Sequence, residues 1–392
     1  MRHLSWQAEE GPLFVPAELP PLTPDESARV TAMRRHLHTL VQASGGLLPF
    51  ARFMEEALYA PGLGYYAAGR RVFGPGGDYT TASSESDAYA ALFAHKVAGL
   101  MHAGLPPEVL EIGPGTGRFA ADFVSELHRR GVALKAYHLL EPHLPQEQEQ
   151  RSRLDNGSEQ AFHWCRRAPA GFRGLVLAHE VFDAQPCARF TWDGRRHHGW
   201  GLVTEGDRLG WRLGPPTPDL AAEIAVIRAE LNAPLPVPYV SEAAADYGRI
   251  FALLEEIPEA LFLIVDYGHP RREFYHHDRC SGTLRCHYRQ RVHDDPLHAP
   301  GVEDITAHVD FSRLACLANT AGWTVEGFTS LAGFAVAQGS LEAVAISQER
   351  RRALARLVDP SVMGEVFKVL VLVRGESLPF PDLERSDRLA SL

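Results

Sequence analysis

A short apolar run followed by three alternating glycines limits the folds open to this chain more than any other segment. Residues 109–112 (Val-Leu-Glu-Ile) can form a buried parallel strand. Gly113, Gly115 and Gly117 follow at every second position, and apolar residues then recur at helical spacing until Gly131 supplies a stop signal. Strand, glycine-rich turn and helix predict the opening βαβ unit of a nucleotide-binding sheet, because glycines let the backbone pass close to a ligand.

The spacing of the glycines indicates which ligand they suit. A dinucleotide fold requires G-x-G-x-x-G, whose third glycine would fall on Arg118, so a pyrophosphate fits poorly. Residues 111–117 instead follow the pattern Glu-x-Gly-x-Gly-x-Gly, which resembles motif I of class I S-adenosylmethionine (SAM) methyltransferases. The start of the next helix can then meet the SAM carboxylate, and Glu141, which ends the next strand-like stretch, can accept the ribose hydroxyls. The alternative is a glycine-rich turn with no ligand. We expect these residues to bind SAM: Glu111, Gly113, Pro114, Gly115, Gly117 and Glu141.

Composition narrows the class of protein further. With 392 residues, 45% of them hydrophobic, and a mean hydropathy of -0.17, the chain is expected to be a soluble globular protein with one large domain or two. A net charge of -10 argues against general affinity for nucleic acid, although a local basic patch remains open. No apolar run approaches the roughly 20 residues that cross a bilayer, so we expect no membrane insertion. The N-terminus lacks an apolar signal core, and five cysteines without a CxxC pair predict a reduced, cytoplasmic protein.

The order of patterns along the chain predicts an α/β fold with insertions. Residues 1–24 are expected to be irregular, and residues 25–106 to form a helical and loop cap region in which 27–59 is largely helix. Residues 107–392 are expected to form the SAM-binding, Rossmann-like domain. Its insertions are expected at about 200–257, with polar loops and a helix at 219–231, and at 269–310, as a long polar loop. The predicted strands are 109–112, 134–140, 175–178, 261–266, 323–328 and 366–373.

Two carboxylates are expected just beyond the end of the third predicted strand. Glu180 and Asp183 lie where open α/β sheets place their ligands, and they share a side if the chain turns helical there. Two such groups beside a transferable methyl suit a cationic nitrogen acceptor, because they can hold a guanidinium by paired hydrogen bonds. Helix capping in a solvated turn is the alternative for both residues.

A second group of candidates lies in residues 77–82, Gly-Asp-Tyr-Thr-Thr-Ala. Glycine beside Asp and paired threonines gives a tight turn rich in hydroxyls and backbone donors. We expect Asp78 and Thr81 to reach over the methionine end of SAM. Taken alone, the run is equally compatible with an ordinary turn.

The polar segment around 276–298 raises the question of a metal. Its His and Cys residues lack a familiar CxxC, HxxxH or CxxH pair, so we predict no metal. A substrate-facing loop is expected instead, with a surface hairpin or a zinc site as alternatives. Asp304 and Thr306 also resemble an N-cap region for a helix near 311–321. The residues that raise the question are His276, His277, Cys280, Cys286, His287 and His293.

Taken together, these segments resemble the MidA family of class I SAM methyltransferases. The resemblance spans roughly residues 37–375, and its most specific runs are 180–186 (Glu-Val-Phe-Asp-Ala-Gln-Pro) and 304–311 (Asp-Ile-Thr-Ala-His-Val-Asp-Phe). The other matching runs are 53–59, 62–66, 77–81, 111–117, 265–268, 282–285, 294–296 and 363–368. It implies a mostly parallel sheet with a C-terminal antiparallel strand, SAM as cofactor, and His308 beside Glu180 and Asp183 as a catalytic residue.

The same resemblance implies a biological role. Mitochondrial members methylate an arginine of a respiratory complex I subunit during assembly, and this chain resembles a bacterial relative of them. We therefore expect a methyltransferase that acts on a protein arginine, with a respiratory complex subunit as a candidate acceptor. Small-molecule N- or O-methylation is one alternative, and a non-catalytic assembly factor that uses the fold for binding is another.

Two departures from the family pattern lie near the expected site. The family usually has Asn before the Glu-x-x-Asp run, where this chain has His179. It typically continues Pro-Glu after residue 82, where this chain has Ser-Ser-Glu-Ser, so Glu85 is the nearest acid. These departures predict a change in cofactor affinity or acceptor choice, and the His179 imidazole is a candidate to replace a missing base.

Overall fold

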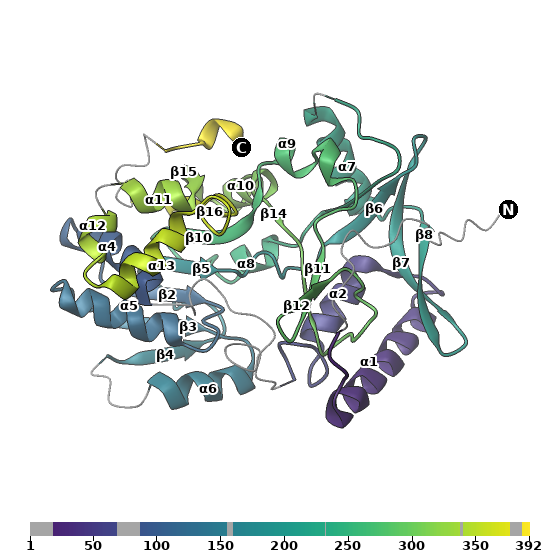
Figure 1. Cartoon of the computed structure of the whole chain (residues 1–392), viewed down its shortest axis with the longest axis horizontal. Coiled ribbons are helices and arrows are strands. Elements are labelled where there is room, and N and C mark those ends of the chain that lie inside the picture. Colours follow the sequence, from purple (N-terminus) through teal and green to yellow (C-terminus); the bar gives the residue numbers. More distant parts are fainter. Residues whose placement is uncertain (1–18, 69–86, 155–159, 232, 338–339, 377–385) are drawn as a thin grey trace.

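A large, mostly parallel β-sheet forms one half of the molecule in the computed structural model, which describes residues 19–68, 87–154, 160–231, 233–337, 340–376 and 386–392 (Figure 1). Its strand order is β15-β16-β10-β5-β2-β3-β4, and β14 pairs with β10. Strand β16 runs antiparallel between β10 and β15, whereas β4, β3, β2, β5 and β10 are mutually parallel. The predicted fold class is therefore confirmed. The strands are β2 (Glu108–Ile112), β3 (Ala136–Leu140), β4 (Phe162–Cys165), β5 (Arg173–His179), β10 (Glu259–His269), β14 (Val309–Asp310), β15 (Thr324–Ser330) and β16 (Phe367–Arg374).

All six predicted strands are present, with ends that differ by a few residues. The prediction missed the short strand β14 and also β4, which pairs with β3 at the edge of the sheet. Its four residues are mostly half-buried, so they carry neither a long apolar run nor a clear alternation. Strands β5, β10 and β16 are buried along most of their length, as expected where helices cover both faces of a sheet.

The two faces of this sheet pack against separate sets of helices. One face packs against α4, α5, α11, α12 and α13, and the other against α8 and α10. Successive strand residues alternate between these two cores, as the pleat requires. These helices and their neighbours are α4 (Asp87–His102), α5 (Arg118–Arg129), α6 (Leu144–Leu154), α8 (Gly248–Ala252), α10 (Phe311–Thr320), α11 (Leu331–Val336), α12 (Ser340–Val344) and α13 (Gln348–Val358), with η3 (Leu389–Ser391) near the C-terminus.

The N-terminal region, predicted to be largely helix over 27–59, contains two helices. Helix α1 (Pro24–Ala43) starts at a capping box formed by Thr23 and Glu26, and α2 (Phe50–Tyr59) follows the short strand β1 (Leu48–Pro49). Gly45 and Gly46 separate the helices with φ values of 72° and 92°. Residues 27–59 are therefore largely helical, as predicted, and the left-handed glycines end α1 and redirect the chain before α2.

A second, antiparallel sheet lies beside the first and is absent from the sequence prediction. Its order is β1-β7-β6-β9, with β8 on β7, and it lies with α1, α2 and α7 on the right of Figure 1. The prediction of polar loops over 200–257 is wrong where β7, β8 and β9 lie, whereas the helix predicted at 219–231 is present as α7. The glycines of β7 and β8 weaken the strand signal. Phe50, Phe53 and Leu202 share one core with Leu110 of the large sheet. The elements are β6 (Ala188–Trp192), β7 (His197–Glu205), β8 (Arg208–Gly214), α7 (Pro218–Glu230) and β9 (Tyr239–Ala243).

The segment expected as a long polar loop over 269–310 is partly regular structure. It contains a small three-stranded sheet of order β12-β11-β13, which lies between the two larger sheets in Figure 1. Its elements are α9 (Arg271–Phe274), η1 (His277–Arg279), β11 (Arg285–Tyr288), β12 (Arg291–His293) and β13 (Asp304–Thr306). Among the helices in the described residues, none is both long and apolar enough to cross a membrane.

Candidate active site

The glycine turn between β2 and α5 has the backbone conformation that a close ligand requires. Gly113, Gly115 and Gly117 have φ values of 60°, 54° and 77°, in the left-handed region that side chains disfavour. Gly117 is the residue before α5, and no side chain caps this helix start. The first N–H groups of α5 therefore face the turn and can bind an anionic group.

Glu141 lies directly after β3, and hydrogen bonds tie it to the glycine turn. Its carboxylate accepts hydrogen bonds from the His143 N–H (2.9 Å) and from the Gln150 side-chain amide (3.0 Å). The same amide of Gln150 donates to the Gly115 carbonyl at 2.8 Å, and Trp164 Nε1 donates to the amide oxygen at 2.8 Å. Gln150 therefore fixes the distance between the turn and Glu141.

Burial raises the pKa of Glu141 to about 7, against the opposing hydrogen bonds from His143 and Gln150. Further hydrogen-bond donors, such as a pair of ribose hydroxyls, would stabilise the ionised form of this buried carboxylate. Sequence reasoning missed Gln150, because a Gln inside the polar run of α6 carries no signal that it is fully buried.

Glu111 lies inside β2 rather than at its end. Its side chain is buried, and the Tyr137 hydroxyl of β3 donates a hydrogen bond to it at 2.7 Å. Burial raises the pKa of Glu111 to about 7, although the bond from Tyr137 lowers it. The structure places Glu111 inside the sheet, hydrogen-bonded to Tyr137. Its contribution to cofactor binding stays a prediction.

The chain turns sharply after β5, where Glu180 and Asp183 lie. Glu180 has a φ of 52°, unusual for a residue with a side chain, and such positions occur often at functional sites. The segment is a turn rather than a helix, so the helical facing of the two acids does not occur. Asp266 of β10 shapes the turn by accepting hydrogen bonds from the N–H groups of Val181, Phe182 and Asp183 at 3.2, 2.8 and 3.2 Å.

A residue of β10 also fixes the side chain of Asp183. The Tyr267 hydroxyl donates a hydrogen bond to Asp183 Oδ2, and the ring of Tyr267 lies against that of His308 with centroids 5.4 Å apart. Asp183 Oδ1 is buried, and no described residue hydrogen-bonds to it. Burial raises the pKa of Asp183 to about 6 despite the bond from Tyr267. The structure thus presents a carboxylate with one oxygen fixed and the other available for a ligand.

His308, predicted as a catalytic residue, lies near Asp183. It lines one pocket together with Asp183, and its backbone N–H donates to Thr283 Oγ1 at 3.1 Å. Burial lowers the pKa of His308 to about 4, so its imidazole is neutral near pH 7. Its Nδ1 atom is buried and has no hydrogen-bond partner among the residues described.

His179, the departure from the family pattern, belongs to an aromatic cluster. The Tyr89 hydroxyl and His179 Nδ1 are hydrogen-bonded at 2.8 Å, and the rings of Phe93 and Phe119 lie 5.1 and 4.4 Å away. Burial lowers the pKa of His179 to about 3. This environment favours a neutral packing residue and argues against the base role considered for it.

Asp304 and Thr306 are not the expected N-cap region. Both lie on β13, and the N-cap of α10 is Asp310, whose side chain accepts a hydrogen bond from Arg313 N at 3.0 Å. The cap therefore lies four residues after Thr306, because the chain first forms β13 and β14. Asp304 instead accepts a hydrogen bond from the hydroxyl of Tyr66 at 3.0 Å.

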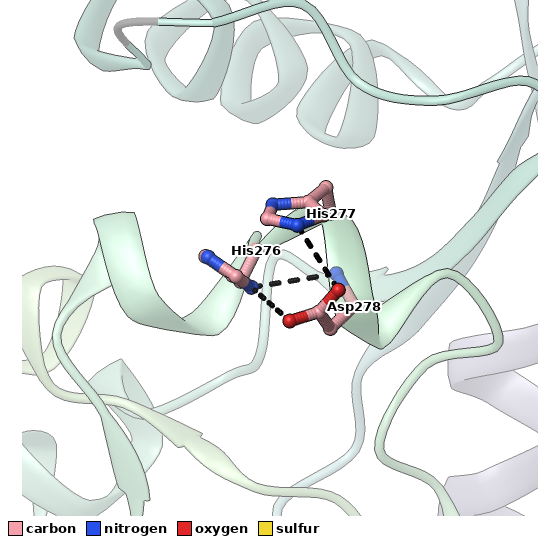
Figure 2. A group of neighbouring side chains, drawn as sticks. All are labelled: His276, His277 and Asp278. Atoms are coloured by element: carbon pink, nitrogen blue, oxygen red, sulfur yellow. Dashed lines mark hydrogen bonds and ion pairs between the residues drawn. The ribbon is translucent and has the colours of Figure 1, made fainter.

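The polar residues considered for metal binding fall into two groups. His276, His277 and Asp278 meet on the surface at η1, where Asp278 contacts both rings at 3.4 and 3.0 Å (Figure 2). The three residues are consecutive in the chain, and His277 and Asp278 are exposed to solvent.

The second group is buried and consists of Cys286, His293 and Glu303. Glu303 accepts hydrogen bonds from His293 Nε2 (3.1 Å), His298 Nδ1 (3.0 Å) and Ala299 N (3.1 Å). Burial favours the protonated form of Glu303, but these bonds hold its pKa below the ordinary value. Hydrogen bonding therefore accounts for the buried charge of Glu303, whereas His293 Nδ1 is buried and has no hydrogen-bond partner among the described residues. The absence of a metal stays a prediction.

Asp78, Thr81 and the departure at residues 83–86 lie outside the residues that the structure describes. Their roles remain predictions from the sequence.

Comparisons with known proteins agree with this geometry. Residues 93–329 match the family described as "Putative S-adenosyl-L-methionine-dependent methyltransferase". The chain is 30% identical to the mouse protein arginine methyltransferase NDUFAF7, mitochondrial, over 75% of this chain and 71% of the relative. It is also 30% identical to the Drosophila melanogaster homolog of that protein, over 91% and 89% of the two chains.

Two crystal structures from Burkholderia thailandensis are similar to the whole fold. One, bound to S-adenosyl-homocysteine, has a TM-score of 0.83 and 31% identity, covering 95% of this chain and all of that chain. The other, a native structure, has a TM-score of 0.85 with the same identity and coverage.

Proposed function

This chain belongs to the MidA-like family of S-adenosyl-L-methionine-dependent methyltransferases, and from that premise we propose that its acceptor is an arginine side chain of a protein. The cofactor is SAM. The observation that carries the proposal is Asp183, a buried carboxylate beyond the end of β5 with one oxygen held by Tyr267 and the other without a described partner. The relatives named as protein arginine methyltransferases support the same acceptor.

The glycine turn and Glu141 hold the cofactor in this proposal. Backbone groups of 113–117 and the start of α5 meet the amino-acid end, and Glu141 accepts the ribose hydroxyls. The glycine conformations fit such a ligand, because the bare backbone of the turn can approach it closely. Gln150 holds both parts in register through its bonds to Gly115 and Glu141.

Glu180 and Asp183 hold the acceptor at the other side of the site. Bound SAM supplies a methyl group already activated on its sulfonium, so the protein's main task is to position a nitrogen in line with it and to exclude water. Asp183 accepts hydrogen bonds from the guanidinium and keeps its nitrogen oriented. As the N–CH₃ bond forms and the S–CH₃ bond breaks, one proton leaves the nitrogen. Neutral His308 and the Asp183 carboxylate line the pocket and can receive it.

Methyl labelling of a cell lysate tests the acceptor directly. The lysate is incubated with the enzyme and SAM carrying a radioactive methyl, and the proteins are hydrolysed to amino acids. We expect the label in methylarginine, lost with Asp183→Asn and retained with the control Asp207→Asn, which changes an exposed acid in the β7–β8 turn. Label confined to methyl-lysine or to small molecules would contradict the proposal.

A further inference from the structure

Two sequence runs that resemble the family pattern, 53–59 and 62–66, meet at the C-terminal end of α2. The chain folds back there, and the N–H of Tyr66 donates to a carbonyl in the last turn of α2 at 2.9 Å. Gly64 makes this close return possible, because a Cβ at that position would lie 2.6 Å from the backbone nitrogen of Tyr59. The rings of Tyr59 and Tyr66 are thereby stacked, with centroids 5.6 Å apart and planes 19° from parallel.

Tyr59 also contacts the cofactor side of the site. Its ring stacks on that of His143, with centroids 6.1 Å apart and planes 10° from parallel. His143 is the second residue after Glu141, and its backbone N–H donates to the Glu141 carboxylate at 2.9 Å. A ligand that binds Glu141 therefore binds the same carboxylate that orders the backbone of His143.

The hydroxyl of Tyr59 reaches the acceptor side of the site. It donates a hydrogen bond to the Ala184 carbonyl at 2.9 Å, in the turn beyond β5 that carries Asp183. The neighbouring hydroxyl of Tyr66 donates to Asp304 Oδ2 of β13 at 3.0 Å. The two stacked tyrosines therefore bond the turn that carries Asp183 and also β13.

Charged groups on both sides of the site act on the Tyr59 hydroxyl. Burial raises its pKa above the ordinary value, and the negative charges of Asp304, Asp183 and Glu141 raise that pKa further. Arg249, whose guanidinium lies 5.8 Å from the ring centroid of Tyr59, opposes them and lowers the pKa. The hydroxyl therefore stays protonated near neutral pH and remains a hydrogen-bond donor.

We propose that Tyr59 is a positioning residue that couples cofactor binding to acceptor binding, because it joins the ring of His143 to the turn that carries Asp183. This inference rests on the proposed function, which assigns Glu141 to the cofactor and Asp183 to the acceptor. Tyr59 itself does not line the pocket that holds Asp183.

The coupling follows from which groups each ligand orders. With the cofactor bound, Glu141 and His143 are held, and the stacked ring of Tyr59 keeps its hydroxyl on the Ala184 carbonyl. Without the cofactor this support is weaker, so the turn loses more conformational freedom when an acceptor binds. Each ligand then binds more tightly when the other is present, and thermodynamic linkage makes the two factors equal.

The experiment measures binding of N-acetyl-L-arginine amide by titration calorimetry or ligand-observed NMR, with and without saturating S-adenosyl-homocysteine. The wild type should bind this probe at least about fivefold more tightly when S-adenosyl-homocysteine is present. Tyr59→Phe removes the hydroxyl and keeps the ring, so this coupling factor should fall below about twofold. Affinity for S-adenosyl-homocysteine alone should stay within about twofold, because the glycine turn and Glu141 are unchanged.

Tyr239→Phe is the matched control. The Tyr239 hydroxyl also donates to a backbone carbonyl, that of His276 at 3.2 Å, and neither residue lines the pocket. This variant should keep the wild-type coupling factor.

His143→Ala tests the other end of the same connection. It removes the ring on which Tyr59 stacks, so the coupling factor should fall as it does in Tyr59→Phe. The double variant should lose no more coupling than either single variant, because both changes break one connection. The factor is a ratio within one variant, so a change in affinity for S-adenosyl-homocysteine does not alter it at saturation.

The outcomes separate this inference from the proposed function. A wild-type coupling factor in Tyr59→Phe, or a wild type that binds the probe equally in both states, would overturn the inference. Equal weakening of the probe by Tyr59→Phe in both states would show that the hydroxyl only supports the turn, and would overturn the coupling as well. In these cases an arginine probe that binds the wild type and is weakened by Asp183→Asn leaves the proposed function standing. A wild type that binds no arginine probe in either state would count against both.

Discussion

The hydroxyl of Tyr267 donates a hydrogen bond to Asp183 Oδ2 across the gap between β10 and the turn after β5. This bond lowers the pKa of Asp183, while burial raises it to about 6. Asp266, the residue before Tyr267, holds the backbone of the same turn through three N–H groups. Two successive residues of β10 therefore position the carboxylate that we assign to the acceptor.

Removing the Tyr267 hydroxyl should move the pH dependence of the reaction. Tyr267→Phe removes a bond that favours ionised Asp183, so the pKa of Asp183 should rise and the ionised form should appear only at higher pH. The acid limb of kcat/KM should therefore shift to higher pH, while SAM affinity stays within about twofold. The measurement is a pH profile of methyl transfer to the labelled acceptor. An acid limb at the wild-type position would show that Asp183 does not control it.

Glu141 should control cofactor affinity. Glu141→Ala removes a carboxylate that can accept two hydroxyls, and we expect SAM binding to weaken by about 1–3 kcal/mol. Titration calorimetry with SAM measures this, with Glu149→Ala on the following helix, α6, as control. A dissociation constant equal to that of the wild type would assign the ribose to another residue.

Glu141 should also make the free energy of unfolding depend on pH. The folded pKa of Glu141, about 7, lies above its ordinary value of 4.5, so the folded protein binds more protons between these pH values. Stability of the cofactor-free protein should then fall as pH rises from about 4.5 to 7. Glu141→Gln cannot titrate and should flatten this slope in denaturation curves. A slope identical to that of the wild type would contradict the raised pKa.

Asp266 should stabilise the folded protein by holding the turn after β5. Burial, followed by repulsion from Asp183 and Glu180, raises its pKa, so the neutral form is favoured. Asp266→Asn keeps an acceptor for the three N–H groups of the turn but places its amide against the N–H of Tyr267, so it should cost less stability than removal of the side chain. Asp266→Ala leaves all four N–H groups without this acceptor and should lower the free energy of unfolding by at least about 2 kcal/mol. Equal stability of the two variants in chemical denaturation would refute this assignment.

The residues around Glu303 should hold no stoichiometric metal. Its carboxylate accepts bonds from His293, His298 and the Ala299 N–H, which accounts for its buried charge. Elemental analysis of purified protein should therefore find far less than one zinc per chain. One zinc per chain that disappears in His293→Ala would overturn this expectation.

Local patterns in the sequence were enough to predict six of the eight strands of the large sheet, the glycine turn and the two acids after β5. Each depends on residues close together in the chain: an apolar run, alternating glycines, or an acid at a strand end. The second sheet could not be predicted in this way. Its strands contain glycines and histidines, and β1 pairs with β7 from about 150 residues away in the chain.

The supporting residues of the site depend on the fold. Gln150 is one of several glutamines in a polar helix, and only packing shows that it joins Gly115 to Glu141. Asp266 and Tyr267 belong to a run that resembles the family but had no role assigned to it. The sequence alone could identify the cofactor side of the site far better than the acceptor side.

The central claim is that Asp183 serves the acceptor and not the cofactor. Its most direct test compares SAM binding and methyl transfer in Asp183→Asn, which keeps the shape of Asp183 and removes its charge. We predict a SAM dissociation constant within about threefold of the wild type and a single-turnover rate of methyl transfer to the acceptor lowered by about 10²-fold or more. Parallel loss of SAM affinity and rate would assign Asp183 to the cofactor. A rate equal to that of the wild type would contradict its role at the acceptor.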